Sequence, residues 1–224
     1  MMATSDLPFQ RAAATIARVG RALYRRGWLP ATSGNLSLRL DQSSCAITVS
    51  GRHKGRLTAE DSMRVDLAGA PLGPGRPSAE TLLHTGLYRW SPDVGAVLHT
   101  HGPASTVLGL RLAGRDRLTL AGYELLKAFA GVETHAARVS FPIFDNTQDI
   151  PALADRVGAW LLGARPPICG YLIRGHGTYV WGQDLDEACR HLEALEYLAG
   201  CELALAAPGL PLLSRPPHEP WDEP

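Results

Sequence analysis

The chain has 224 residues, long enough for one large domain with a well-buried core, and nothing in it demands two. Its 22 basic and 22 acidic residues cancel, so there is no broad positive surface for nucleic acid or an anionic membrane. No segment reaches the roughly 18 apolar residues of a membrane-spanning helix, and the N-terminus lacks the regions of a secretory signal. The four cysteines show no Cys-x-x-Cys spacing and are expected to be reduced. We therefore expect a cytoplasmic protein.

The first part of the chain predicts a helix and then an antiparallel meander. Apolar residues recur every three or four positions over 7–26, with Asp6 placed to cap that helix and Gly27 to end it. A second helix is expected from Ser78, as N-cap, to Trp90. Strands are expected at residues 36–40, 46–50 and 63–67.

The rest of the chain alternates predicted strands with predicted helices. Strands are expected at 94–100, around Leu118, and at 138–144, 169–174 and 178–181. Helices are expected at 103–110, 123–129 and 149–162, and from a capping box at Asp184 and Glu187 to about Ala206. This pattern favours a three-layer α/β/α domain with a largely antiparallel central sheet over a doubly wound parallel sheet. We expect one domain over residues 1–224, with a core at about 8–206 and a proline-rich C-terminal tail at 207–224.

Two histidines separated by one residue follow an apolar run, in Val97-Leu98-His99-Thr100-His101-Gly102. If the run is a strand, residues two apart project from one face, so His99 and His101 point into the same space. A catalytic zinc usually takes three protein ligands. His176 is the candidate third, because Gly175 and Gly177 let the backbone turn sharply and approach another strand. The alternative to a metal site is that these histidines only satisfy buried hydrogen bonds.

Three short loops have a composition suited to holding an anion: Ser33-Gly34-Asn35, Ser50-Gly51 and Ser78-Ala79. Glycine exposes backbone amides, and serine and asparagine add neutral donors. Each loop taken singly is more often only a turn or a cap. The residues after Ser50-Gly51 favour a phosphate, because they include the cations Arg52, His53, Lys54 and Arg56.

Two carboxylates are candidates for a general base. Glu80 follows Ser78 by two residues, and Glu124 begins the segment Tyr123-Glu124-Leu125-Leu126-Lys127. The alternative for both residues is that each is only an exposed glutamate in the first turn of a helix, with no catalytic role. Lys127 lies one turn beyond Glu124 and is a candidate partner for a phosphate. Glu80 and His84 are four apart, so they form either a further metal-ligand pair or part of a solvated helical face.

Several motifs in this order resemble the class II aldolase family, which includes fuculose-phosphate aldolase, ribulose-phosphate epimerase and the adducin head domain. They are Ser33-Gly34-Asn35, Val49-Ser50-Gly51, Pro77-Ser78-Ala79-Glu80, His99-Thr100-His101 and Gly175-His176-Gly177, within residues 8–206. Three further segments resemble the branch of the family that dehydrates methylthioribulose 1-phosphate in methionine salvage. They are Ser50-Gly51-Arg52-His53-Lys54-Gly55-Arg56-Leu57, Tyr123-Glu124-Leu125-Leu126-Lys127 and Tyr179-Val180-Trp181-Gly182.

The resemblance implies one Zn²⁺ per subunit, a sugar-phosphate substrate, and a homotetramer whose active sites lie near subunit boundaries. The implied zinc ligands are His99, His101 and His176. The residues implied or considered for holding the phosphate are Asn35, Ser50, Gly51 and Ser78, with Lys54 and Lys127.

Glu124 is the implied acid/base, and it would carry the C3 proton to the departing C4 hydroxyl. In the aldolase branch the glutamate at the position of Glu80 serves in proton transfer or on the metal. This chain has both glutamates, so both remain catalytic candidates. Ala79 stands where aldolases often have a second serine. An aldolase or epimerase, and an adducin-like interaction module, remain alternatives; the three histidines favour an enzyme.

Overall fold

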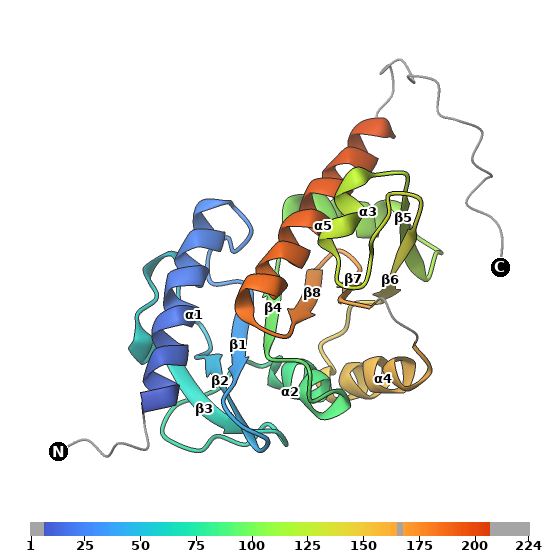
Figure 1. Cartoon of the computed structure of the whole chain (residues 1–224). Coiled ribbons are helices and arrows are strands. Elements are labelled where there is room, and N and C mark those ends of the chain that lie inside the picture. Colours follow the sequence, from blue (N-terminus) through green and yellow to red (C-terminus); the bar gives the residue numbers. More distant parts are fainter. Residues whose placement is uncertain (1–6, 165–167, 207–224) are drawn as a thin grey trace.

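A mixed eight-stranded sheet forms the centre of the protein in the computed structural model, which describes residues 7–164 and 168–206 (Figure 1). The strands lie in the order β3-β2-β1-β4-β8-β7-β6-β5, and every neighbouring pair is antiparallel except β6 with β7. They are β1 (Asn35–Arg39), β2 (Ser44–Thr48), β3 (Ser62–Asp66), β4 (Ala96–Thr100), β5 (Arg117–Ala121), β6 (Arg138–Phe144), β7 (Gly170–Ile173) and β8 (Gly177–Gly182). The expectation of a largely antiparallel central sheet is confirmed.

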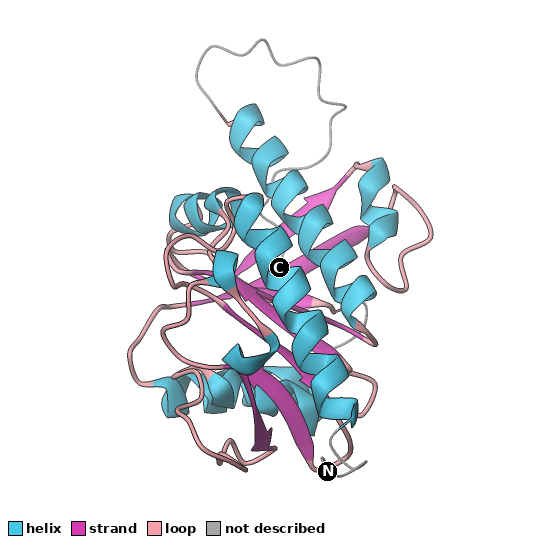
Figure 2. Cartoon of the chain, turned by 90° about the vertical axis from the view of Figure 1, so that its left-hand side faces the viewer, coloured by secondary structure: helices cyan, strands magenta, loops and turns pink. Residues whose placement is uncertain are grey.

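Helices cover both faces of this sheet (Figure 1 and Figure 2). One face carries α1 (Leu7–Arg25), α3 (Pro103–Arg111) and α5 (Leu185–Leu205), and the other carries α2 (Thr81–Trp90) and α4 (Ile150–Gly163). Short 3₁₀ turns complete the fold: η2 (Lys54–Arg56), η3 (Ala59–Asp61) and η4 (Glu124–Ala128). This is the expected three-layer α/β/α arrangement. Among the described helices, none is long and apolar enough to cross a membrane.

Successive side chains of each strand point to opposite faces of the sheet and so divide the core into two layers. In β4, Ala96 and Leu98 pack in the cluster under α1, α3 and α5, whereas Val97 packs in the cluster under α2 and α4. Residues two apart in a strand share a face. His99 therefore projects on the same side as Val97, toward α2, at the end of a strand that is buried along its whole length.

The predicted start of the second helix is wrong by two residues, because its N-cap is Glu80 and not Ser78. The helix begins at Thr81, and Ser78 lies in the turn before it. The Ser78 hydroxyl accepts from the Glu80 amide at 3.3 Å, and its carbonyl accepts from the Thr81 amide at 3.1 Å. The cause is an isolated antiparallel bridge between Val49 and Pro77, which keeps the chain extended up to Ser78.

The other predicted elements are present, with small shifts at their ends. The helix expected over 123–129 is the 3₁₀ turn η4. The predicted capping box of α5 forms in part. Asp184 Oδ1 accepts from the Glu187 amide, as expected, but Glu187 Oε2 accepts from the amide of Gln183, the residue before the N-cap, both at 2.8 Å. The four cysteines are free thiols. Asp6 and the tail at 207–224 lie outside the described residues.

Candidate metal centre and substrate pocket

Three histidines from two separate parts of the sheet meet at one point. His99 is the last residue but one of β4, His101 follows directly after the strand, and His176 lies in the turn between β7 and β8. The Nε2 atoms of His101 and His99 are 3.0 Å apart, and those of His99 and His176 are 3.3 Å apart. One ligand nitrogen from each residue lies within 4.8 Å of the other two, so the cluster can hold a metal ion.

Glycines make this meeting sterically allowed. Gly175 has a φ of 67°, which is in the left-handed region that favours glycine. A Cβ on Gly177 would lie 2.0 Å from the Thr100 carbonyl oxygen, so only glycine lets β8 approach β4 this closely. The predicted role of the glycine pair, to bring His176 against another strand, is confirmed.

Two of the three imidazoles, those of His99 and His101, are held in their neutral form. Burial and the two neighbouring histidines lower the pKa of His99 well below its usual value. Burial, followed by the charge of His176, lowers the pKa of His101 to about 4. His99 Nδ1–H donates to the Thr178 carbonyl at 3.0 Å, which leaves its Nε2 lone pair free. Neutral imidazoles with free lone pairs are the form that binds metals.

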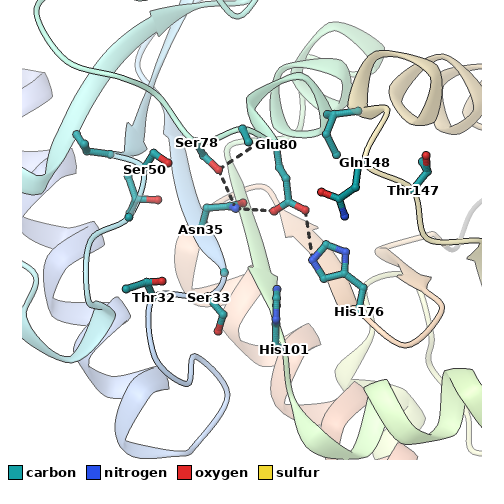
Figure 3. Close-up of a pocket in the computed structure, with 16 residues that line it drawn as sticks. Thr32, Ser33, Asn35, Ser50, Ser78, Glu80, His101, Thr147, Gln148 and His176 are labelled. Carbon is teal, nitrogen blue, oxygen red and sulfur yellow. Dashed lines mark hydrogen bonds and ion pairs between the residues drawn. The ribbon is translucent and has the colours of Figure 1, made fainter.

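Glu80 faces this cluster from the start of α2 (Figure 3). Its Oε2 lies 3.3 Å from His99 Nε2, and its Oε1 lies 3.3 Å from His176 Nε2. The side chain of Asn35 donates to Glu80 Oε2 at 2.8 Å and to Ser78 Oγ at 3.0 Å. Residues predicted from three separate motifs therefore form one hydrogen-bonded group.

The cluster opens into a cavity of about 330 Å³. Polar loop residues line one side of it: Thr32, Ser33, Gly34, Asn35, Ser50, Gly51, Ser78 and Ala79. Glu80, His101 and His176 lie at its centre, and Thr147 and Gln148 lie on the opposite side (Figure 3). Ile150 also lines the cavity. The three loops predicted to hold an anion thus meet in one wall, with the histidine cluster beside them.

Lys54 lies beneath that wall and is not part of its lining. Its side chain is buried, and Nζ donates at 2.9 Å to the carbonyls of Thr32 and Arg52. Burial lowers the pKa of Lys54 to about 8, so it keeps its charge at neutral pH. Lys54 therefore ties two loops together and places a positive charge under the polar side of the pocket.

Glu124 and Lys127 lie outside this pocket. They form an ion pair on η4, with 70% of the Glu124 side chain and 44% of the Lys127 side chain exposed. The hydrogen bond from Lys127 lowers the pKa of the Glu124 carboxyl. Leu126 and Phe129 anchor η4 in the core under α5, on the opposite face of the sheet from α2. Within one chain, the two candidate carboxylates are separated.

The sequence matches the model of the class II aldolase and adducin N-terminal domain over residues 14–203. The chain belongs to this family. A methylthioribulose-1-phosphate dehydratase from Pseudomonas paraeruginosa is 60% identical over 185 residues, which are 82% of this chain and 89% of the relative. One from Pseudomonas fluorescens is 54% identical over 199 residues, 88% of this chain and 95% of the relative.

The fold agrees with that of solved class II aldolases. The L-fuculose-1-phosphate aldolase from Thermus thermophilus has a TM-score of 0.71 at 27% identity, covering 88% of this chain and 96% of that one. The family resemblance seen in the motifs is thereby confirmed, as is the predicted fold.

Reasoning from sequence missed two parts of this class II aldolase site. One is the part of the pocket lining formed by Thr147, Gln148 and Ile150, which carries no motif beyond the N-cap of α4. The other is Tyr179, which pairs with His99 across β8 and β4 and stacks on its ring with centroids 4.2 Å apart. A tyrosine in an apolar strand gives no sign, before the register is known, that it supports a ligand.

Proposed function

We propose that this protein is a zinc-dependent dehydratase that converts 5-methylthioribulose 1-phosphate to 5-methylthio-2,3-dioxopentyl phosphate and water, in methionine salvage in the cytoplasm. The observation that carries the proposal is the pocket in which a three-histidine cluster adjoins a wall of Gly-, Ser- and Asn-containing loops suited to holding an anion. Relatives at 54% and 60% identity that carry the name of this dehydratase support the choice of substrate.

Zinc fits the donor set. Zn–N bonds of about 2.0–2.1 Å in a tetrahedral site hold ligand nitrogens about 3.3 Å apart. The two Nε2 separations of 3.0 and 3.3 Å agree with that value. A bound zinc would supply a Lewis acid beside the C2 ketone of the substrate.

The residues of the chain supply the remaining steps. The loops at Ser33, Ser50 and Ser78 would bind the phosphate, with the charge of Lys54 beneath them. A carboxylate removes the proton from C3 and then donates it to the departing C4 hydroxyl, so that one group acts as base and then as acid. Loss of water gives an enol that tautomerises to the diketone.

We assign the acid/base to Glu124 of a neighbouring subunit in a homotetramer. A carboxylate that is 70% exposed and outside its own pocket can reach a reacting group only in another copy of the chain. The exposed apolar side chains of α3, η4 and α5 support an interface near it; they are Val107, Leu110, Leu125 and Tyr197.

A class II aldolase or epimerase is the second candidate. The observation that favours it is Glu80, which touches both His99 and His176 and so suits proton transfer within one subunit. Aldol cleavage would use the same pocket but would need room for a separate aldehyde.

Product analysis distinguishes these reactions. Zinc-loaded protein is incubated with methylthioribulose 1-phosphate or with fuculose 1-phosphate, and the products are followed by NMR. We expect the first to lose water and form a diketone phosphate, and the second to remain intact. Cleavage of fuculose 1-phosphate without dehydration of the first substrate would favour the aldolase. Turnover of neither, together with capture of a protein partner, would favour an adducin-like module.

A further inference from the structure

A chain of buried hydrogen bonds runs behind the pocket, from α2 through β1 to Glu80. We propose that His84 is a positioning residue, which fixes the amide of Asn35 through its Nε2–H and thereby orients the Glu80 carboxylate toward the histidine cluster. This inference deepens the proposed function, because it concerns the same site. It also replaces the expectation that Glu80 and His84 act as a metal-ligand pair or a solvated helical face.

His84 is enclosed and uncharged. Its side chain on α2 is fully buried, and its ring lies edge-on to Tyr179 with centroids 5.5 Å apart. Burial, with a smaller contribution from His99, lowers the pKa of His84 to about 3. A neutral imidazole carries one N–H and one bare nitrogen, so it can donate on one side only.

The contact between Asn35 and Glu80 sets the donor-to-acceptor direction of these hydrogen bonds. The Asn35 NH₂ donates to Glu80 Oε2 at 2.8 Å and to Ser78 Oγ at 3.0 Å, so this end of the amide faces the carboxylate. The amide oxygen of Asn35 then points inward and accepts from His84 Nε2–H. The reversed amide would put its oxygen against the Glu80 carboxylate and leave two acceptors facing each other.

The hydrogen bonds on the other side of His84, as far as Tyr88, have defined directions as well. Because His84 Nε2 carries the proton, Nδ1 accepts, and the Ser37 hydroxyl donates to it at 2.7 Å. Ser37 Oγ then accepts from the Tyr88 hydroxyl, also at 2.7 Å. Burial raises the pKa of Tyr88, so its hydroxyl keeps the proton that it donates. Every hydrogen bond in this series therefore has one defined donor and one defined acceptor.

The fold supplies these residues at regular spacings. Asn35 and Ser37 are two apart on β1 and share a face. Glu80, His84 and Tyr88 follow one another at intervals of four along one side of α2. Both N–H groups of Asn35 are engaged, one by Ser78 and one by Glu80. Without the donor at His84, the Asn35 amide is free to flip, and Glu80 loses the bond that holds its carboxylate.

Spectroscopy tests the orientation without any substrate. Long-range ¹H–¹⁵N spectra of ¹⁵N-histidine-labelled, zinc-loaded protein should show His84 neutral, with its proton on Nε2, at pH 6 and at pH 8. His191 is an internal reference of the opposite kind, since its Nε2 accepts from the Ala130 amide at 3.0 Å and its Nδ1–H donates to the Trp181 carbonyl at 2.7 Å. A His84 signal with the proton on Nδ1, or on both nitrogens, would overturn the inference.

Two substitutions test the consequence. His84→Leu removes the donor, whereas His84→Gln keeps an N–H near the position of Nε2. We expect His84→Leu to keep its zinc and to lose about 10- to 100-fold in kcat, the usual effect of removing such a supporting partner. His84→Gln should stay within about threefold of the unmodified protein, since the donor is kept. Equal kcat values in both variants would contradict the inference.

The outcomes also separate this inference from the proposed function. If His84→Leu does not fold, the tautomer and His84→Gln decide, and a loss of more than about tenfold in His84→Gln contradicts the inference. If the unmodified protein turns over another sugar phosphate, the variants are compared on that substrate. If it turns over none, the proposed function fails, and the tautomer alone decides.

Discussion

His99 and His101 stay neutral because they are buried and lie close to each other and to His176. The pKa values of His99 and His101 are lowered by burial first and by neighbouring histidines second. These two imidazoles therefore stay uncharged even without a metal ion. Glu80 and the loop residues are the polar groups that line the pocket beside them.

The two glutamates differ in what surrounds them, and this gives opposite expectations. Glu124→Gln keeps the size of the side chain but cannot take a proton, so turnover should fall by about 10²–10⁴-fold with zinc content unchanged. Glu133→Gln, an exposed neighbour in sequence, is the matched control and should keep full activity. Kinetics and metal analysis of both variants make the comparison.

Glu80→Gln completes the test. We expect it to retain more turnover than Glu124→Gln, because the amide oxygen of the substituted side chain still accepts from Asn35. If Glu80→Gln is the inactive protein and Glu124→Gln is nearly normal, the two roles are exchanged.

The turn between β7 and β8 determines whether His176 reaches the cluster. Gly177→Ala would push a Cβ to 2.0 Å from the Thr100 carbonyl, and backbone there cannot move without shifting β4. We expect loss of bound zinc and a lower melting temperature. Gly158→Ala in α4 is the control, because a Cβ there meets nothing within 4 Å. It should keep its zinc and gain about 0.5–1 kcal/mol of stability. Normal zinc content in Gly177→Ala would show that the turn has more freedom than this geometry allows.

A buried carboxylate of α5 packs against the start of α3 and makes the stability of the fold depend on pH. Glu196 of α5 accepts from the Ser105 hydroxyl, and its carboxylate occupies the space that a Cβ on Gly102 would need. Burial raises the pKa of Glu196 above its usual value. A raised folded-state pKa gives stability that is present below the unfolded pKa and is lost as pH rises through the folded pKa.

Glu196→Gln should therefore gain stability relative to the unmodified protein as the pH rises from about 4 to 7, since Gln cannot ionise. Thermal unfolding across this range measures the difference in melting temperature. The exposed Glu133→Gln is again the control and should show a constant difference. A constant difference for Glu196→Gln as well would mean that the buried carboxylate does not govern this dependence.

The elements themselves were predictable because they depend on local signals. Periodicity located the helices and strands, and Asp184 with Glu187 located the start of α5. Ser78 was misplaced because a long-range bridge, invisible in the sequence, outweighs its preference for an N-cap. The prediction that His84 lies on a solvated helical face was wrong for a similar reason, since the side chain is buried. Burial of a polar residue on a helix depends on the strand that packs against it, which local sequence does not give.

The candidate site was predictable where spacing alone carries the chemistry. His99 and His101 share a strand face, and His176 stands between glycines, so the cluster followed from sequence. The loops at Asn35, Ser50 and Ser78 also met in one wall. Tyr179, Gln148 and the link from His84 to Asn35 depend on register and on packing between distant segments, which no local pattern encodes.

The assembled molecule should be a tetramer in which each pocket takes Glu124 from a neighbour. Light scattering after size exclusion should give about 96 kDa, four times the 24.1 kDa of one chain. A monomer at micromolar concentration would contradict the assignment of Glu124 to a neighbouring pocket.

Mixing two inactive proteins tests that assignment directly. Glu124→Gln has intact histidines, and His176→Ala has an intact Glu124. Random reassembly of equal amounts should leave about a quarter of the pockets with both groups, and activity should recover to about that level. Mixing Glu124→Gln with itself is the control. If the subunits are shown to exchange and no activity is recovered, then Glu124 acts in the pocket of its own chain or in no pocket.

The histidine cluster also sets when a metal can be bound during synthesis. His99 and His176 are 77 residues apart, and between them lie α3, β5, β6, α4 and β7. At about 5–20 residues per second, a ribosome needs about 4–15 s to add that length. Throughout this interval the nascent chain holds only two of the three histidines of the cluster. A metal ion that needs all three could therefore be bound only late in the maturation of the chain, once β8 has paired with β4.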